Sequence, residues 1–265
     1  MQPLTWLVLA WRDMARAGWI SFGHGLALAA FGGVIMAVAN HRFWLLVSAM
    51  SGFLVVAPVL ATSFYAFSRA IERREPADWS VVRRTWLSWQ RGRSEGGGDY
   101  WCLVKFGVLL AVAATGWVLV SASLITLLAP APIETPVDFV RHVVLARNGW
   151  LFELWLALGS VLAAPIFASS VIAMPLLLDR RVTLWQAVLT SWKTVLDNPI
   201  PMAFWAALIM GFTLLGLASL MLGLILIMPM LGHASWHAYR DLVDVSGLPP
   251  REVADGAAAT NGVAL

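Results

Sequence analysis

Long stretches without charge dominate the pattern of hydrophobic and polar positions along this chain. Four of them, at 19–39, 43–68, 106–129 and 154–178, have the roughly 20 mostly apolar residues that a helix needs to cross a membrane, and the fourth belongs to a predicted span at about 150–178. A fifth runs uncharged from residue 200 to residue 239. At about 1.5 Å per residue it would make about 60 Å of helix, which is too long for one crossing.

We divide this last stretch into two spans, 200–216 and 219–239, with a tight turn among the small residues of 211–219. One long tilted helix is the alternative. With the turn, the sequence predicts an all-α polytopic membrane protein of six transmembrane helices, arranged as three hairpins with amphipathic cytoplasmic interfacial helices.

Composition excludes a soluble globular protein. Hydrophobic residues make up 60% of the chain and charged residues 12%, whereas about a quarter of a soluble domain is charged. The net charge of +3 does not indicate a nucleic-acid partner, because the basic residues are spread over the connections between spans.

The basic residues also predict the orientation. They concentrate between the second and third spans and between the fourth and fifth, so these connections and both termini are expected to be cytoplasmic. The six-span membrane domain at 19–240 then lies between an N-terminal interfacial helix at 1–18 and a disordered cytoplasmic tail at 241–265. On the opposite side, a capping box that begins at Thr135 predicts a short helix at about 136–147.

A glycine precedes a proline by six residues in each even-numbered span. The pairs are Gly52 and Pro58, Gly159 and Pro165, and Gly223 and Pro229. Prolines would kink these helices and glycines would admit close neighbours, so the even-numbered spans are expected to form the bundle interior of three repeated hairpins. The alternative is that this spacing arises by chance, because membrane helices are rich in both glycine and proline.

Tryptophan recurs at a spacing of seven in two connecting segments, as Trp79 and Trp86 and again as Trp185 and Trp192. Leu and Val share that face while Arg and Lys lie elsewhere, which predicts helices on the cytoplasmic membrane surface, with residues 3–17 as a third. We expect them to bind anionic lipid headgroups. The alternative is that they are linker helices packing on one another.

Three histidines are the candidates for ligand chemistry. His233 and His237 lie four residues apart on one helix face, and His24 shares their depth if there are six spans. A haem or metal site is one hypothesis. The other is interfacial histidines bonded to backbone or headgroups, which is favoured because no acidic or cysteine ligand stands nearby in sequence.

The sequence offers no positive support for an enzyme. It contains no Walker loop, no HExxH and no serine elbow, and no charged residue deep within a span. We therefore expect a protein without a catalytic residue, cofactor or metal, acting as an accessory, scaffold or assembly factor that binds lipids or other membrane proteins. A transporter or channel for an uncharged or amphipathic solute is the alternative.

Four segments resemble a known family. They are WRDMARAGWISFGHGLALAAFG, GFLVVAPVLATSFYAFSR, MPLLLDRRVTLWQAVLTSWKTVLDNPIPMAFW and LGHASWHAYRDL. Over residues 11–243 the chain is similar to an uncharacterised bacterial integral-membrane family, domain of unknown function 2189. The resemblance implies a six-span inner-membrane protein of proteobacteria and implies no activity, substrate or catalytic residue.

Overall fold

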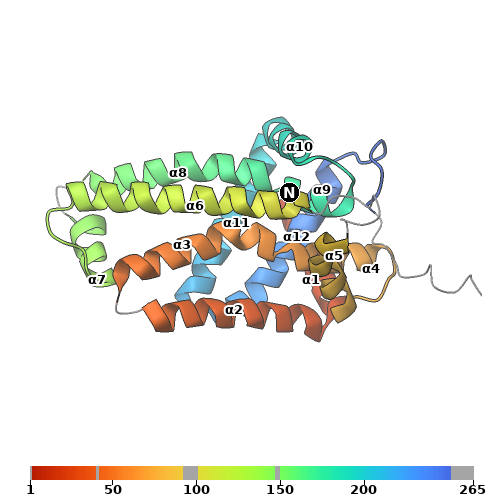
Figure 1. Ribbon diagram of the computed structural model, residues 1–265, viewed down its shortest axis with the longest axis horizontal. Helices are drawn as coiled ribbons and strands as arrows, with labels where there is room; N and C mark the ends of the chain where they lie inside the picture. Colours follow the sequence, from red (N-terminus) through yellow and green to blue (C-terminus); the bar gives the residue numbers. More distant parts are fainter. Residues whose placement is uncertain (1, 40–41, 92–100, 147–149, 252–265) are drawn as a thin grey trace, which may run out of the picture.

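The computed structural model describes residues 2–39, 42–91, 101–146 and 150–251. Within these residues five helical stretches are long and apolar enough to cross a membrane. They are α2 (Trp19–Ala39), α3 with α4 (Phe43–Leu60, Thr62–Glu72), α6 (Trp101–Leu128), α8 with α9 (Leu151–Ser170, Ala173–Asp179) and α11 (Pro199–Ala218). The predicted all-α, multi-pass class is therefore confirmed. In Figure 1 α2, α3, α6 and α8 run along the long axis of the molecule, whereas α11 is tilted across it.

The last apolar stretch forms two helices, so the single long helix is wrong. α11 ends at Ala218 and α12 (Leu224–Leu242) begins after the turn 219–223, a few residues later than the turn that the small residues predicted. Leu220 and Met221 adopt left-handed backbone conformations in this turn, at an energetic cost for residues with a side chain. α12 is not among the five apolar stretches of the described chain, because polar residues fill its second half.

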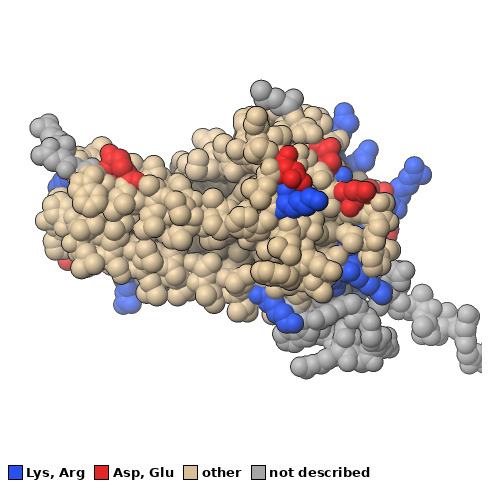
Figure 2. All heavy atoms as spheres, turned by 90° about the horizontal axis from the view of Figure 1, so that it is seen from above, with Lys and Arg blue, Asp and Glu red and all other residues tan. Residues whose placement is uncertain are grey.

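Shorter helices gather at the two ends of the bundle. At one end lie α1 (Gln2–Ala17), α4, α5 (Trp79–Arg91), α9, α10 (Leu184–Asp197) and the second half of α12 (Figure 1). We call this the polar end, because the charged side chains visible in Figure 2 are concentrated there. Gly18, with a φ of 60°, makes the turn from α1 into α2, a conformation that glycine adopts without strain.

The other end, the aromatic end, holds α7 (Pro136–Phe139) and the π-helical turn η1 (Val140–Val144). The predicted capping box is confirmed: Thr135 Oγ1 accepts from the Asp138 backbone N–H, and the Asp138 carboxylate accepts from the Thr135 N–H. The helical segment ends at Val144, a little before the expected end at residue 147, which lies outside the described residues.

The prolines of the even-numbered spans have unequal effects on their helices. Pro58 is followed by a break at Ala61, between α3 and α4, and Pro165 by a break at 171–172, between α8 and α9. α12 continues through Pro229 without a break. Beyond α12 the predicted disordered tail is ordered as far as Arg251, whose N–H donates to the Asp179 carbonyl, and residues 252–265 lie outside the described chain.

The most deeply buried part of the molecule is at the polar end. Its largest fully buried side chains include Trp6, Trp205, Trp236 and Phe64, which come from α1, α11, α12 and α4. Large apolar side chains along the spans, such as Val38 and Val112, are instead exposed. Contiguous apolar surface of this kind belongs against lipid, so the spans meet the hydrocarbon while the polar end encloses a core.

Candidate functional site

Two of the predicted histidines belong to a buried cluster at the polar end, formed by Asp13, Ser21, Ser68, His233 and His237. We call it the histidine network. His233 lies at its centre, fully buried, with Nε2 2.9 Å from Ser21 Oγ and Nδ1 2.7 Å from Ser68 Oγ. Ser68 Oγ donates to Asp13 Oδ2 over 2.6 Å. Side chains of α2 and α4 therefore meet the His233 imidazole of α12, and α1 joins them through the bond between Asp13 and Ser68.

The hydrogen-bond inventory assigns one ring nitrogen of His233 directly. Ser68 has one hydroxyl proton and gives it to Asp13, so towards His233 its oxygen accepts from Nδ1–H. In a neutral imidazole the other ring nitrogen accepts from the Ser21 hydroxyl. Each nitrogen of His233 thus has a serine hydroxyl within hydrogen-bond distance.

His237 joins the network through the carboxylate of Asp13. His237 Nε2 lies 2.9 Å from Asp13 Oδ2. Burial by itself would raise the pKa of Asp13, but the hydrogen bonds from His237 and Ser68 outweigh burial and hold that pKa below its ordinary value. Asp13 is therefore a carboxylate at neutral pH, enclosed between α1 and α12.

His24 lies close to this network without joining it. Its ring packs edge-on against Phe64 at 5.1 Å between centroids, and the Phe64 ring also contacts His233 at 5.7 Å. His24 hydrogen-bonds the backbone of Leu60 rather than a member of the network. No group of three or more His, Cys, Asp and Glu residues within the described chain is arranged to hold a metal ion.

A second set of polar contacts ties α9 to α12 through Asp179, which we call the aspartate network. Its carboxylate accepts from Tyr239 Oη at 2.8 Å and Arg180 Nε at 2.9 Å, and pairs with Arg73 at 3.4 Å. Burial lowers and the Asp179 charge raises the pKa of Arg180, with a net rise. Asp179 follows the apolar run of α9 directly, so its position as the end of a span is readable from sequence, but its partner on α12 is not.

The four predicted interfacial tryptophans divide into two kinds. Trp79 and Trp185 are 57% and 70% exposed, as expected for side chains that project into a membrane surface. Trp86 Nε1 donates to Ser63 Oγ at 2.8 Å, and Trp192 Nε1 donates to Ser169 Oγ at 2.9 Å. The second tryptophan of each pair therefore attaches its helix to the broken span that precedes it.

The glycines of the repeated pattern have different surroundings. Gly52 has no described atom near the position of a side chain, whereas a Cβ on Gly159 would meet Trp117 at 3.1 Å and one on Gly223 would meet Ser219 Oγ at 2.6 Å. Close helix approaches occur instead at Gly25, against Ile225 and Pro229, and at Gly216, against Leu224. The expectation that glycine admits a close neighbour therefore does not hold for Gly52.

Asp13, Ser21 and Ser68 are the members of the site that sequence reasoning missed. Asp13 carried a usable signal, because it stands on the buried face of an otherwise amphipathic helix next to Met14 and Ala17, where an isolated charge needs a partner. The two serines carried none, since serine is common in membrane helices as a helix-packing residue.

Comparison with known proteins gives one match. A family model described as "Predicted integral membrane protein (DUF2189)" matches residues 45–179, which is half of the chain and extends from the second span to the end of α9. No curated protein and no solved structure matches the chain.

Proposed function

We propose a role for this chain from the premise that it belongs to the DUF2189 family of predicted integral membrane proteins. The proposed role is that of a non-catalytic accessory, scaffold or assembly factor, which binds membrane lipids and partner membrane helices. The rival role, a path for an uncharged or amphipathic solute, requires a polar cavity along the kinked spans.

The observation that carries the proposal is the packing of α12 against its neighbours. Pro229, one of the three prolines expected along a solute path, lies against Gly25 of α2 so closely that no Cβ could be added there. Gly232, one turn further along, lies equally close to Phe64 of α4. Side chains and backbone fill this part of the interior, as a scaffold requires.

Lipid binding is supported by the surface of the polar end. Trp79 and Trp185 are exposed on α5 and α10, and charged side chains gather at this end of the molecule (Figure 2). Indole rings favour the boundary between hydrocarbon and headgroups, while basic side chains attract anionic lipids. Anionic headgroups at the cytoplasmic face are therefore the proposed lipid ligands.

We further propose six crossings as three hairpins, with α12 as the sixth and both termini in the cytoplasm of a bacterial inner membrane. Contact between the two ends of the chain supports an even number: Trp6 Nε1 of α1 donates to Asp241 Oδ2 of α12 at 2.9 Å. A C-terminal fusion to alkaline phosphatase is expected to be inactive, and periplasmic activity would contradict the proposed topology.

The test of the role is purification of the chain at native expression level in a mild detergent, followed by mass spectrometry of the bound proteins and lipids. A stoichiometric membrane-protein partner, with anionic lipid retained, is the expected result. A chain without partner or lipid that conducts a solute across proteoliposomes would replace this role with transport. The matched variant carries Trp79→Ala and Trp185→Ala, which should retain less anionic lipid.

A further inference from the structure

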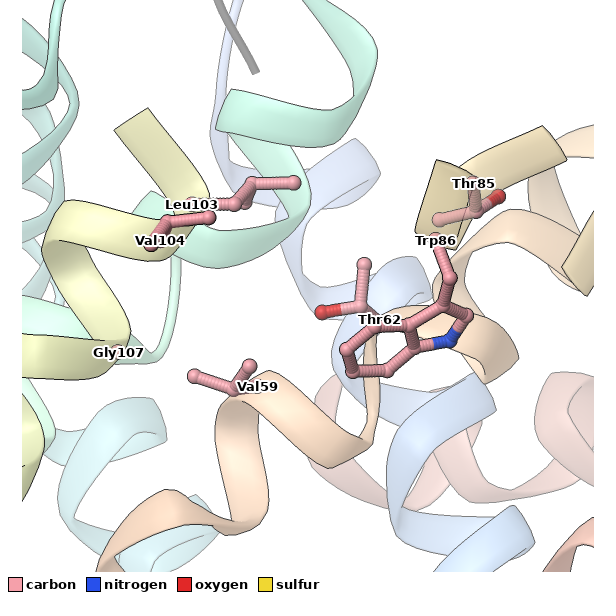
Figure 3. Close-up of a pocket in the computed structure, with 7 residues that line it drawn as sticks. All are labelled: Val59, Thr62, Thr85, Trp86, Leu103, Val104 and Gly107. Carbon is pink, nitrogen blue, oxygen red and sulfur yellow. The ribbon is translucent and has the colours of Figure 1, made fainter. Parts of the chain in front are cut away.

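A cavity at the edge of the polar end lies between α3, α4, α5 and α6. Its volume is about 100 Å³, room for a segment of a hydrocarbon chain rather than for a whole drug-sized ligand. Its lining is apolar except at one side, and its main members are Val59, Thr62, Trp86, Leu103, Val104 and Gly107. Figure 3 presents these side chains around the open space.

Two hydroxyl side chains, Thr62 and Thr85, line this cavity, and in Figure 3 the Thr85 oxygen points away from the open space. Thr62 is 3% exposed, and its hydroxyl oxygen has no hydrogen-bond partner among the described residues. In Figure 3 that oxygen points into the space bordered by Val59 and Gly107. A buried hydroxyl without a hydrogen-bond partner costs free energy. A ligand atom that accepts a hydrogen bond from Thr62 would remove this cost.

The three prolines of the even-numbered spans allow Thr62 to be compared with the residues at equivalent positions. Thr62, Ser169 and His233 each stand four residues after a proline of the three even-numbered spans. Ser169 accepts from Trp192, and His233 is bonded by two serines. The equivalent tryptophan of the first unit, Trp86, bonds Ser63 instead, so Thr62 alone of the three equivalent side chains has no protein partner within the described chain.

We propose that this cavity binds an acyl chain whose carboxyl or ester oxygen accepts a hydrogen bond from Thr62. The methylene chain packs against Val59, Leu103 and Val104, and the oxygen lies where span α3 meets α4. This is the depth of the boundary between hydrocarbon and headgroups, because the adjacent α5 is the amphipathic helix of the polar end. The inference rests on the proposed lipid-binding role and gives it a specific site.

Photolabelling tests the site. The full chain, purified in mild detergent, is irradiated with a phosphatidylglycerol that carries a diazirine on its acyl chain, and the labelled peptides are mapped by mass spectrometry. Label is expected on the segments that contain Val59 and Leu103. A free fatty acid with the same diazirine forms the second arm: labelling by this probe alone identifies a fatty acid as the ligand, and labelling by the phospholipid identifies an ester.

Two glycines of α6 provide a matched pair of variants. Gly107→Leu fills the cavity, because a Cβ there already meets Val59 at 3.7 Å, whereas Gly116→Leu adds the same side chain where no described atom lies within 4 Å. Gly107→Leu should reduce cavity labelling by about tenfold, the equivalent of about 1.4 kcal/mol, and Gly116→Leu should leave it unchanged. Equal cavity labelling in both variants would overturn the proposal.

Thr62 provides a test that does not depend on tolerance of a larger side chain. Thr62→Val keeps the shape and removes the hydroxyl, so it should reduce labelling by roughly three- to tenfold, as expected for one hydrogen bond, while Thr62→Ser should retain it. In delipidated protein Thr62→Val should be at least as stable as the wild type, because it removes an unpaired hydroxyl.

The two proposals fail in different ways. Label on α5 and α10 with none in the cavity of the wild-type protein would overturn the acyl site and leave the general lipid-binding role intact. No label at any position, together with no lipid retained on purification, would overturn both.

Discussion

The polar end and the aromatic end of the bundle are stabilised by different kinds of contact. At the polar end, directional bonds join residues far apart in sequence, such as Ser21 with His233 and Asp13 with His237. At the aromatic end, ring contacts predominate: Phe152 stacks on Trp155, and Phe43 meets Phe139 at 6.0 Å between centroids. The first kind fixes the relative rotation of helices, whereas the second fills space and tolerates adjustment.

This comparison predicts that single substitutions are more damaging at the polar end. The largest effect is expected for Asp13→Ala, which removes the acceptor shared by Ser68 and His237. Loss of one member of a buried polar network leaves its partners unsatisfied and should cost roughly 2–4 kcal/mol. Thermal unfolding in detergent is the measurement, and a loss below about 0.5 kcal/mol would contradict the importance of the network.

A close helix contact should be the next most sensitive. Gly25→Ala inserts a methyl group where α2 meets Ile225 and Pro229, and should destabilise by about 1–3 kcal/mol. Gly33→Ala is the matched control, because it lies on the same helix with no described atom within 4 Å of its added Cβ. Equal unfolding temperatures for the two variants would show that α12 does not lie against α2 in this way.

The aromatic end should respond less to the loss of a hydrogen bond. Trp155 Nε1 donates to Ser121 Oγ at 2.6 Å between α8 and α6. Trp155→Phe removes this bond and keeps most of the ring contacts, so the expected cost is about 1 kcal/mol. A double-mutant cycle with Ser121→Ala measures the pair directly, and a coupling larger than that between Asp13 and His237 would reverse the comparison of the two ends.

The smallest effect is a dependence on pH at the polar end. The pKa of Asp13 lies below its ordinary value of 3.8 in the folded chain, so its contribution to stability is fully present above about pH 4 and is lost as the pH falls through the lower, folded value. The wild type should therefore lose more stability than Asp13→Asn on acidification below pH 4. Parallel acid unfolding curves for the two proteins would contradict this linkage.

The sequence predicted those parts of the fold that depend on whether lipid or water surrounds a segment, and those that depend on local contacts. Stretches without charge identify spans because lipid excludes charge, and the capping box at Thr135 was readable because its partners are three residues apart. The turn between α11 and α12 was predicted too early in the chain. The prediction placed it among the small residues of 211–219, whereas the chain turns at Leu220 and Met221.

The candidate site was predictable only in its histidines. Their spacing placed His233 and His237 on one face, but the rotation of α1 that brings Asp13 to them depends on contacts over 224 residues of sequence. Likewise, the glycine–proline pattern made the three even-numbered spans look alike. That Thr62 lacks a partner within the described chain, whereas Ser169 and His233 are hydrogen-bonded, emerges only from three-dimensional packing.

The hydrogen bonds between α1 and α12 have a consequence for biosynthesis. Translation completes α1 before α12, yet Trp6 bonds Asp241 and Asp13 bonds His237. Until α12 has been made, the Asp13 carboxylate therefore lacks its bond to His237. A chain truncated before α12 keeps this face of α1 uncovered, which distinguishes it from a chain in which the two helices have joined.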